Sequence, residues 1–188
     1  MLINQPILSY IMPTAKKELL PTYAYYLNTL PQKFGINTPR RMAAFMAQFA
    51  HESGELREIK EKWNGKGHQK TYEGNTQIGN KFPGDGKKFL GRGGINITGR
   101  ENYARFGKDF FNDANKFTNN PELVEQPYYA VLSAIWFWTW KKLNVLADAN
   151  NFPRITQIIN RLSLGKEQRL AYYRKALQIF SGAENVYT

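Results

Sequence analysis

The sequence predicts a mainly α-helical domain with one small β element, and three observations support this class. Apolar residues recur at helical spacing in several segments. Hydrophobic residues make up 42% and aromatic residues 14% of the 188 residues, which is enough for a packed core. No linker, internal repeat or low-complexity segment divides the chain. We therefore expect one domain over residues 1–188.

The helix predicted over residues 38–54 is the element around which the rest is organised. Thr38 is a good N-cap, Pro39 suits the first turn, and Gly54 is a common stop signal. Before it, residues 1–37 show helical spacing that we expect Pro31 to end.

The remaining elements follow in chain order. Residues 64–94 are rich in glycine and predict a functional loop region. Residues 95–98 alternate and predict a short strand, so the small β element falls near residues 72–98. Thr98 then begins a helix that ends at Gly107. Three more helices are predicted over residues 121–140 with a core of Leu132, Ile135, Trp136 and Trp138, over 155–162 including Leu162, and over 167–180.

Charge and composition limit the partners. Lys and Arg number 26 against 15 Asp and Glu, and the net charge of +11 favours nucleic acid, anionic lipid or an anionic cell wall without choosing among them. The absence of cysteine excludes disulfides and thiolate chemistry and suits a reducing compartment. We see no secretory signal at Met1 and expect no transmembrane segment, because the longest uncharged apolar run, residues 128–140, is too short.

Glu52 is the first candidate for chemistry. Phe45, Phe49 and Glu52 share one face of the predicted helix, which places a carboxylate on an apolar stripe. Burial raises the pKa of a carboxyl, as does the negative end of the helix dipole, so Glu52 is a candidate general acid. A capping or ion-paired glutamate is the alternative, and this helix alone favours it.

Several other chemistries fail on spacing. The zinc-protease pattern H-E-x-x-H requires histidine where Glu55 stands, and His68 is the one other imidazole. The dinucleotide pattern G-x-G-x-x-G requires glycine where Asn96 stands, and no G-x-S-x-G marks a serine nucleophile. We therefore expect no metal and no cofactor.

Paired carboxylates remain. Glycoside hydrolysis needs one protonated and one ionised carboxyl group. Five glutamates lie before or within the glycine-rich region, and periodicity does not select a partner for Glu52: Glu52, Glu55, Glu58, Glu61 and Glu73. A solvated charged loop is the preferred interpretation of Glu55 and Glu58, and Glu73 is a candidate loop partner of a nearby arginine.

The sequence resembles glycoside hydrolase family 19, the chitinase and phage-endolysin family. AQFAHESG at 47–54 is similar to its A-Q-x-x-H-E-[ST]-G helix, and GRGGINITGRENY at 91–103 to its G-R-G-x-I-Q-[LI]-[ST]-G-R-x-N-Y segment. The resemblance covers roughly residues 35–180, with further matches at 72–74, 84–86, 119–124, 134–138, 155–160, Arg169 and Tyr173. Asn96 departs from the family's glutamine, Gly94 from its proline or leucine, and Arg161-Leu162 from its two glycines.

The resemblance implies a lysozyme-like fold and an inverting mechanism. Glu52 would be the general acid, and Glu61, nine residues later, the general base that activates water. Inversion requires carboxyl groups roughly 6.5–9.5 Å apart. Asn96, Thr98 and Asn102 would line the sugar cleft, and Asn160 and Arg169 would position the water and the base. His51 is also predicted to contact the sugar. Trp63 and Tyr72 are candidate surfaces on which a sugar ring stacks, and the alternative for each is a core residue or a loop anchor.

The resemblance and the charge together predict an endolysin that cleaves the β-1,4 glycan of peptidoglycan, a bacteriolytic and antimicrobial activity. The alternatives are a chitinase, a secreted antibacterial effector, or an inactive wall- or nucleic-acid-binding module. We expect a monomer that contacts the polysaccharide and the anionic envelope, without nucleic acid. We expect synthesis in the cytoplasm without a signal peptide and action on the wall after release, in the host periplasm for a phage endolysin.

Overall fold

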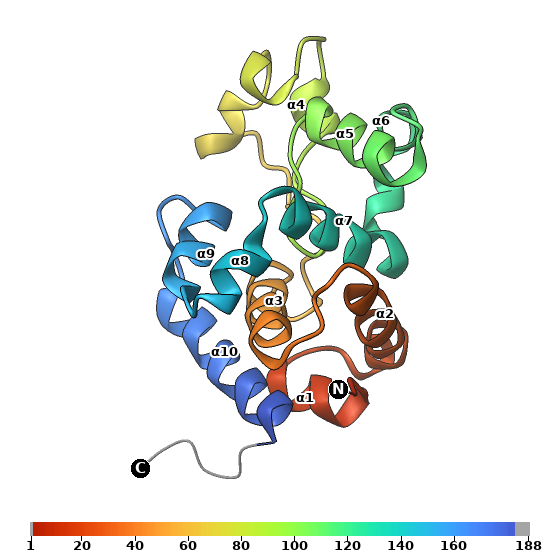
Figure 1. Cartoon of the computed structure of the whole chain (residues 1–188). Coiled ribbons are helices and arrows are strands. Elements are labelled where there is room, and N and C mark those ends of the chain that lie inside the picture. The colour runs from red at the N-terminus through yellow and green to blue at the C-terminus, as the bar shows by residue number, and fades with distance from the viewer. Residues whose placement is uncertain (1, 183–188) are drawn as a thin grey trace. The chain divides into compact units, whose positions relative to one another are not determined.

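The structure, a computed structural model, describes residues 2–182 (Figure 1). These residues form two compact units, the first containing residues 2–58 and 137–182 and the second residues 59–136. Helices are the main regular secondary structure of both units, joined in the second unit by long loops, which confirms the mainly α class. No helix among the described residues is long and apolar enough to cross a membrane. The single domain over residues 1–188 stays a prediction.

The first unit is organised around a central helix, α3 (Pro39–Glu52), which packs most extensively against α10 (Lys166–Ser181) (Figure 1). The other helices of this unit are α1 (Gln5–Ile11), η1 (Lys17–Leu19), α2 (Leu20–Lys33), α8 (Leu143–Asp148) and α9 (Phe152–Ile159). Helix α7 (Pro127–Trp140) begins in the second unit and ends in the first.

The second unit carries the glycine-rich region. Its elements are η2 (Gly67–Thr71), η3 (Thr76–Ile78), α4 (Asp85–Lys88), α5 (Arg100–Phe111), α6 (Lys116–Asn119) and η4 (Pro121–Glu125). Aromatic side chains form its core: Phe106 of α5 stacks on Phe117 of α6 with ring centroids 4.5 Å apart, and Trp136 packs 5.9 Å from Phe106.

Helix α3 has the N-cap, the stop residue and the apolar face that its sequence predicts. The Thr38 hydroxyl accepts the backbone N–H of Arg41 at 3.3 Å, and Gly54 follows the helix with φ +52°. Phe45 and Phe49 are fully buried in the first unit, where Phe45 meets the edge of Trp138. The helix predicted over residues 38–54 is confirmed.

Three predicted helix boundaries are wrong: the end at Pro31, the start at Thr98 and the end at Gly107. Pro31 lies inside the last turn of α2 instead of ending it. Helix α5 begins after Gly99, without a cap from Thr98, and continues past Gly107 to Phe111, with Asn112 as its C-cap. A Cβ on Gly107 would lie 2.3 Å from the carbonyl oxygen of Asp113. Gly107 therefore permits a close backbone approach and does not end the helix.

The small β element is reduced to two isolated bridges among the described residues, Lys60 to Arg92 and Arg92 to Ile97. The strand predicted over residues 95–98 does not form because no neighbouring strand continues the ladder.

The predicted helix over residues 121–140 is two elements, η4 and α7, separated by an extended backbone at Gln126. Its predicted core is confirmed, because Leu132, Ile135, Trp136 and Trp138 are buried. The predicted helix over residues 155–162 ends at Ile159, and Leu162 is 79% exposed. The predicted inclusion of Leu162 in this helix is therefore wrong.

Candidate active site

Glu52 is the last residue of α3 and forms an ion pair across to α10. Its Oε1 accepts a hydrogen bond from Nη2 of Arg169, whose side chain is 1% exposed. The Glu52 side chain keeps 16% of its surface exposed. Glu52 is therefore an ion-paired carboxylate, as the alternative interpretation of the helix expected, and its remaining exposed surface can be reached by a substrate. Its role as general acid stays a prediction.

A second layer of polar groups supports this ion pair. Nη1 of Arg169 donates to Oε1 of Gln48, and Nε2 of Gln48 donates to Oγ1 of Thr156 at 2.8 Å. Sequence reasoning gave no role to Gln48 or Thr156, although both lie in segments that resemble the family. Gln48 lies one helical turn before Glu52, and that spacing is the signal that would have found it.

His51 is a neutral neighbour of the acid candidate. Burial lowers its pKa, and the nearby charge of Arg169 lowers it further, against the opposing effects of Glu52 and a hydrogen bond with Gln168. Its Nδ1 is buried and has no hydrogen-bond partner among the described residues. The imidazole packs on Gly165, where a Cβ would lie 2.1 Å from Cε1.

Glu61 lies in the second unit and is surrounded by hydrogen-bonding groups. Its Oε1 lies 3.0 Å from Nε2 of His68 and accepts from Nε2 of Gln69 at 2.9 Å. Its Oε2 accepts the backbone N–H of Gly91 at 3.2 Å and the Tyr72 hydroxyl at 3.3 Å. The side chain remains 21% exposed, so water can reach the carboxylate.

Gln69 fixes the loop on which Glu61 stands, a role that sequence reasoning missed. It is 3% exposed, donates to the carbonyl of Lys62 at 2.9 Å, and accepts the N–H groups of Asn64 and Gly65 at 2.8 and 3.1 Å. Because both ends of its amide are occupied, the donor it presents to Glu61 has one orientation.

The structure brings three more predicted residues to Glu61. Burial raises the pKa of Tyr72 to about 12, and the charge of Glu61 acts in the same direction, so Tyr72 stays protonated and donates. A Cβ on Gly91 would lie 3.3 Å from Glu61 Oε2, Thr98 Oγ1 and Asn96 Cβ. Gly91 therefore lets the Asn96–Thr98 segment approach the carboxylate closely.

Asn102, Trp63 and Asn160 have structural contacts. Sugar contacts of Asn102 and Trp63 stay predictions, as does the action of Asn160 on the water and the base. Asn102 donates to the carbonyl of Thr98 at 2.7 Å. Trp63 is half-buried, with its ring about 3.8 Å from the Cβ position of Gly65, as expected of a loop anchor. Asn160 Oδ1 accepts the N–H of Leu162 at 3.1 Å. Arg169 contacts the acid candidate, and its predicted action on the water and the base also stays a prediction.

Two other glutamates differ from expectation, and one agrees with it. Glu55 is 6% exposed and not solvated, because it accepts from Thr14 N at 2.5 Å and from the Tyr172 hydroxyl at 2.6 Å. Glu73 accepts the N–H groups of Gly84 and Gly86 at 2.6 and 2.8 Å in place of the expected arginine. Glu58 is exposed, as expected.

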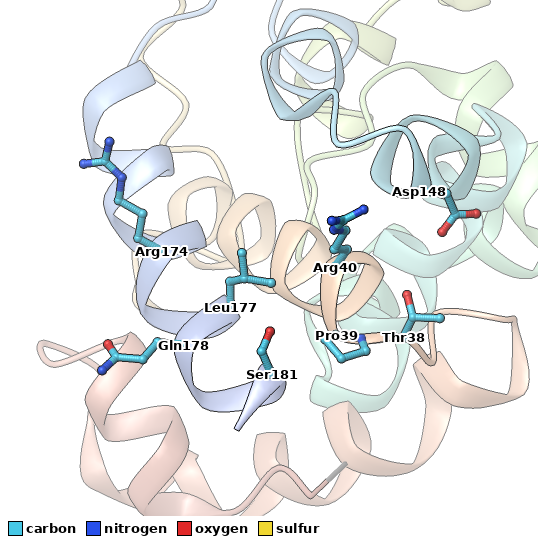
Figure 2. A pocket seen from close by; sticks show the side chains of 8 residues that line it. All are labelled: Thr38, Pro39, Arg40, Asp148, Arg174, Leu177, Gln178 and Ser181. Atoms are coloured by element: carbon cyan, nitrogen blue, oxygen red, sulfur yellow. The ribbon is translucent and has the colours of Figure 1, made fainter. Parts of the chain in front are cut away.

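Two further observations delimit the site. Among residues 2–182, no group of three or more His, Asp or Glu side chains is placed to hold a metal ion. A pocket of about 560 Å³ lies at the beginning of α3, where Pro39 and Arg40 stand beside Leu177 of α10 (Figure 2). It contains none of the predicted site residues, and Glu52 lies at the opposite end of α3.

Carboxylates held by several donors are the groups that acid–base cleavage of glycosidic bonds requires, and the comparisons place the chain in that class. The family model described as Chitinase class I matches residues 33–159. A glycosyl hydrolase family 19 domain-containing protein of Haemophilus influenzae is 29% identical over 93% of this chain and 95% of its own length. The chain is a glycosidase and belongs to glycoside hydrolase family 19.

Other relatives agree with this family. An acidic endochitinase of Dioscorea japonica is 31% identical over 64% of this chain and 46% of its own length. An endochitinase of Pisum sativum is 34% identical over 77% of this chain and 55% of its own length. The chain thus spans about half the length of these plant relatives. A crystal structure of chitinase C from Streptomyces griseus has the same fold, with a TM-score of 0.68 at 21% identity over 95% of this chain and 92% of that one.

Proposed function

We propose that this family 19 glycosidase cleaves β-1,4 linkages within the glycan strands of peptidoglycan, with Glu52 as general acid and Glu61 as general base. The observation that carries the mechanism is the contrast between the two carboxylates. Glu52 is paired with the Arg169 cation, whereas Glu61 is held by the Gln69 amide, the Tyr72 hydroxyl and a backbone N–H. Inverting hydrolysis uses two carboxyl groups in different surroundings, and the assignment of the proton to Glu52 is part of the proposal, taken from the family resemblance.

In the proposed reaction, Glu52 gives its proton to the glycosidic oxygen as the bond to the anomeric carbon breaks. Glu61 removes a proton from a water molecule that attacks the opposite face of the sugar. The donors around Glu61 hold its carboxylate in one orientation, and its 21% exposure leaves room for that water. The protonated Tyr72 remains a donor throughout, because its pKa is raised to about 12.

The net charge of +11 supports peptidoglycan as the substrate. The bacterial envelope is anionic and chitin is neutral, so a basic enzyme is attracted to the former. Chitin is the second candidate, because the plant relatives are endochitinases. We place the action at the cell wall after release from the cytoplasm, in the host periplasm for a phage endolysin, and we propose a monomer. The cysteine-free sequence is compatible with this route.

Turbidity loss of permeabilised Gram-negative cells, measured beside release of reducing sugar from colloidal chitin, tests the proposal. We expect lysis of the cells, and a loss of at least about 10²-fold in both Glu52→Gln and Glu61→Gln. Glu58→Gln is the matched control, because Glu58 is an exposed carboxylate between the two. Activity on chitin without lysis of the cells would identify chitin, and not peptidoglycan, as the substrate. Wall binding without hydrolysis would identify an inactive binding module and overturn the proposal.

A further inference from the structure

We propose that Gln48 and Thr156 are positioning residues, which act through Arg169 to fix the orientation of the Glu52 carboxylate. The inference rests on the proposed role of Glu52 and adds two residues that do not touch substrate. The contacts form one chain within the first unit, from Thr156 of α9 through Gln48 of α3 and Arg169 of α10 to Glu52.

Arg169 is the rigid member of this chain. Its guanidinium donates to three different acceptors: Nη2 to Glu52, Nη1 to Gln48, and Nε to the Leu164 carbonyl at 3.1 Å. The group is planar and its donors point in fixed directions, so three acceptors determine both its position and its plane. Removal of the Gln48 acceptor would leave two contacts, about which the plane can tilt, and the donor that faces Glu52 would move with it.

Gln48 has one possible orientation. A guanidinium has donors only, so the amide oxygen of Gln48 must face Arg169. The amide nitrogen then faces the Thr156 hydroxyl, which accepts at 2.8 Å. Arg169 therefore determines the orientation of the amide, and Thr156 holds the other end of the Gln48 side chain in place by accepting from its nitrogen.

Burial separates positioning from binding. Gln48 is 0%, Arg169 1% and Thr156 3% exposed, whereas the Glu52 side chain is 16% exposed. A substrate can therefore contact Glu52 but not the three residues behind it. Loss of Gln48 or Thr156 should lower kcat, which depends on the orientation of the acid, and leave KM nearly unchanged.

The test measures kcat and KM on a short glycan fragment for Gln48→Met, Thr156→Val and Thr156→Ser, well below each variant's melting temperature. We expect Gln48→Met, which removes both hydrogen bonds at similar volume, to lower kcat by about 10- to 100-fold with KM within about twofold. Thr156→Val should lower kcat less, and Thr156→Ser, which keeps the hydroxyl, should restore it. Thr118→Val is the matched control, because Thr118 is a buried threonine of the second unit whose hydroxyl bonds to backbone carbonyls.

A double-mutant cycle distinguishes positioning from a general loss of structure. In an Arg169→Met background the hydrogen bonds that connect Gln48 to Glu52 through Arg169 are already broken, so adding Gln48→Met should not lower kcat further. Independent packing defects would instead multiply their effects on kcat. A folded Gln48→Met enzyme with wild-type kcat, or multiplicative losses in the cycle, would overturn the inference. The proposed function fails separately, if folded Glu52→Gln keeps its activity.

Discussion

At the scale of single residues, Gly165 shows how the chain makes room beside the acid candidate. Its φ of +70° lies in the left-handed region, and a Cβ would lie 2.1 Å from His51 Cε1. Its carbonyl accepts the N–H of Arg169 at 2.9 Å in the first turn of α10. Gly165 therefore sets both the packing of His51 and the start of the helix that carries Arg169.

We expect Gly165→Ala to lower the free energy of unfolding by about 1–3 kcal/mol and also to reduce kcat, because both the backbone strain and the collision with His51 act at α10. Gly74→Ala is the matched control, since Gly74 has a similar φ of +67° with nothing within 4 Å of its Cβ position. Chemical denaturation of both variants measures the loss in free energy of unfolding at each position. An equal cost at the two positions would mean that the collision with His51 contributes nothing.

The same scale shows which site residues the sequence can predict. Glu52 follows from helical spacing, since its apolar neighbours are three and seven residues away. Its partner Arg169 lies 117 residues further on, and Thr156 lies 108 residues from Gln48. No local pattern encodes such contacts, because the packing of α3, α9 and α10 creates them. The resemblance supplied a role for Arg169. It also covers Gln48 and Thr156, but only the structure gave these two residues a role.

At the scale of elements, the buried Glu55 ties the turn after α3 to two distant segments. Its carboxylate accepts from Thr14 near the N-terminus and from Tyr172 of α10. Burial by itself raises the pKa of Glu55, but the hydrogen bonds from Tyr172 and Thr14 and the charge of Arg57 outweigh it, so the pKa is lowered.

A lowered pKa in the folded state means that this carboxylate stabilises the protein above its unfolded pKa of about 4.3 and loses that contribution as the pH falls through the folded value. We expect the free energy of unfolding to decrease from pH 5 to pH 3, and Glu55→Gln to reduce the slope while costing about 1–3 kcal/mol at pH 7. Denaturant titrations at several pH values measure this. Glu58→Gln, an exposed control, should keep the wild-type slope, and an unchanged slope in Glu55→Gln would contradict the assignment.

The elements also show why some local signals succeed. The cap and stop signals of α3 hold because Thr38 and Gly54 lie at exposed or half-exposed turns, where local preference is not opposed. Gly107 misleads because its small size serves a contact with Asp113. The alternation of residues 95–98 misleads because a strand requires a neighbour, and the described chain offers only single bridges.

At the scale of the whole molecule, the chain is a family 19 glycosidase in which the acid candidate and the base candidate belong to different compact units. Glu52 ends a helix of the first unit, and Glu61 stands on a loop of the second. The central claim is that these two carboxylates act on one glycosidic bond, with the attacking water entering from the face opposite the leaving group. That claim fixes the configuration of the product.

The most direct test is the anomeric configuration of the first product formed from a short β-1,4-linked glycan, read by proton NMR before mutarotation. Attack by water from the opposite face inverts the anomeric carbon, so the account predicts that the new reducing end appears as the α-anomer. Initial appearance of the β-anomer would show retention, which requires a covalent or otherwise different intermediate. That result would contradict the assignment of Glu52 and Glu61 as acid and base.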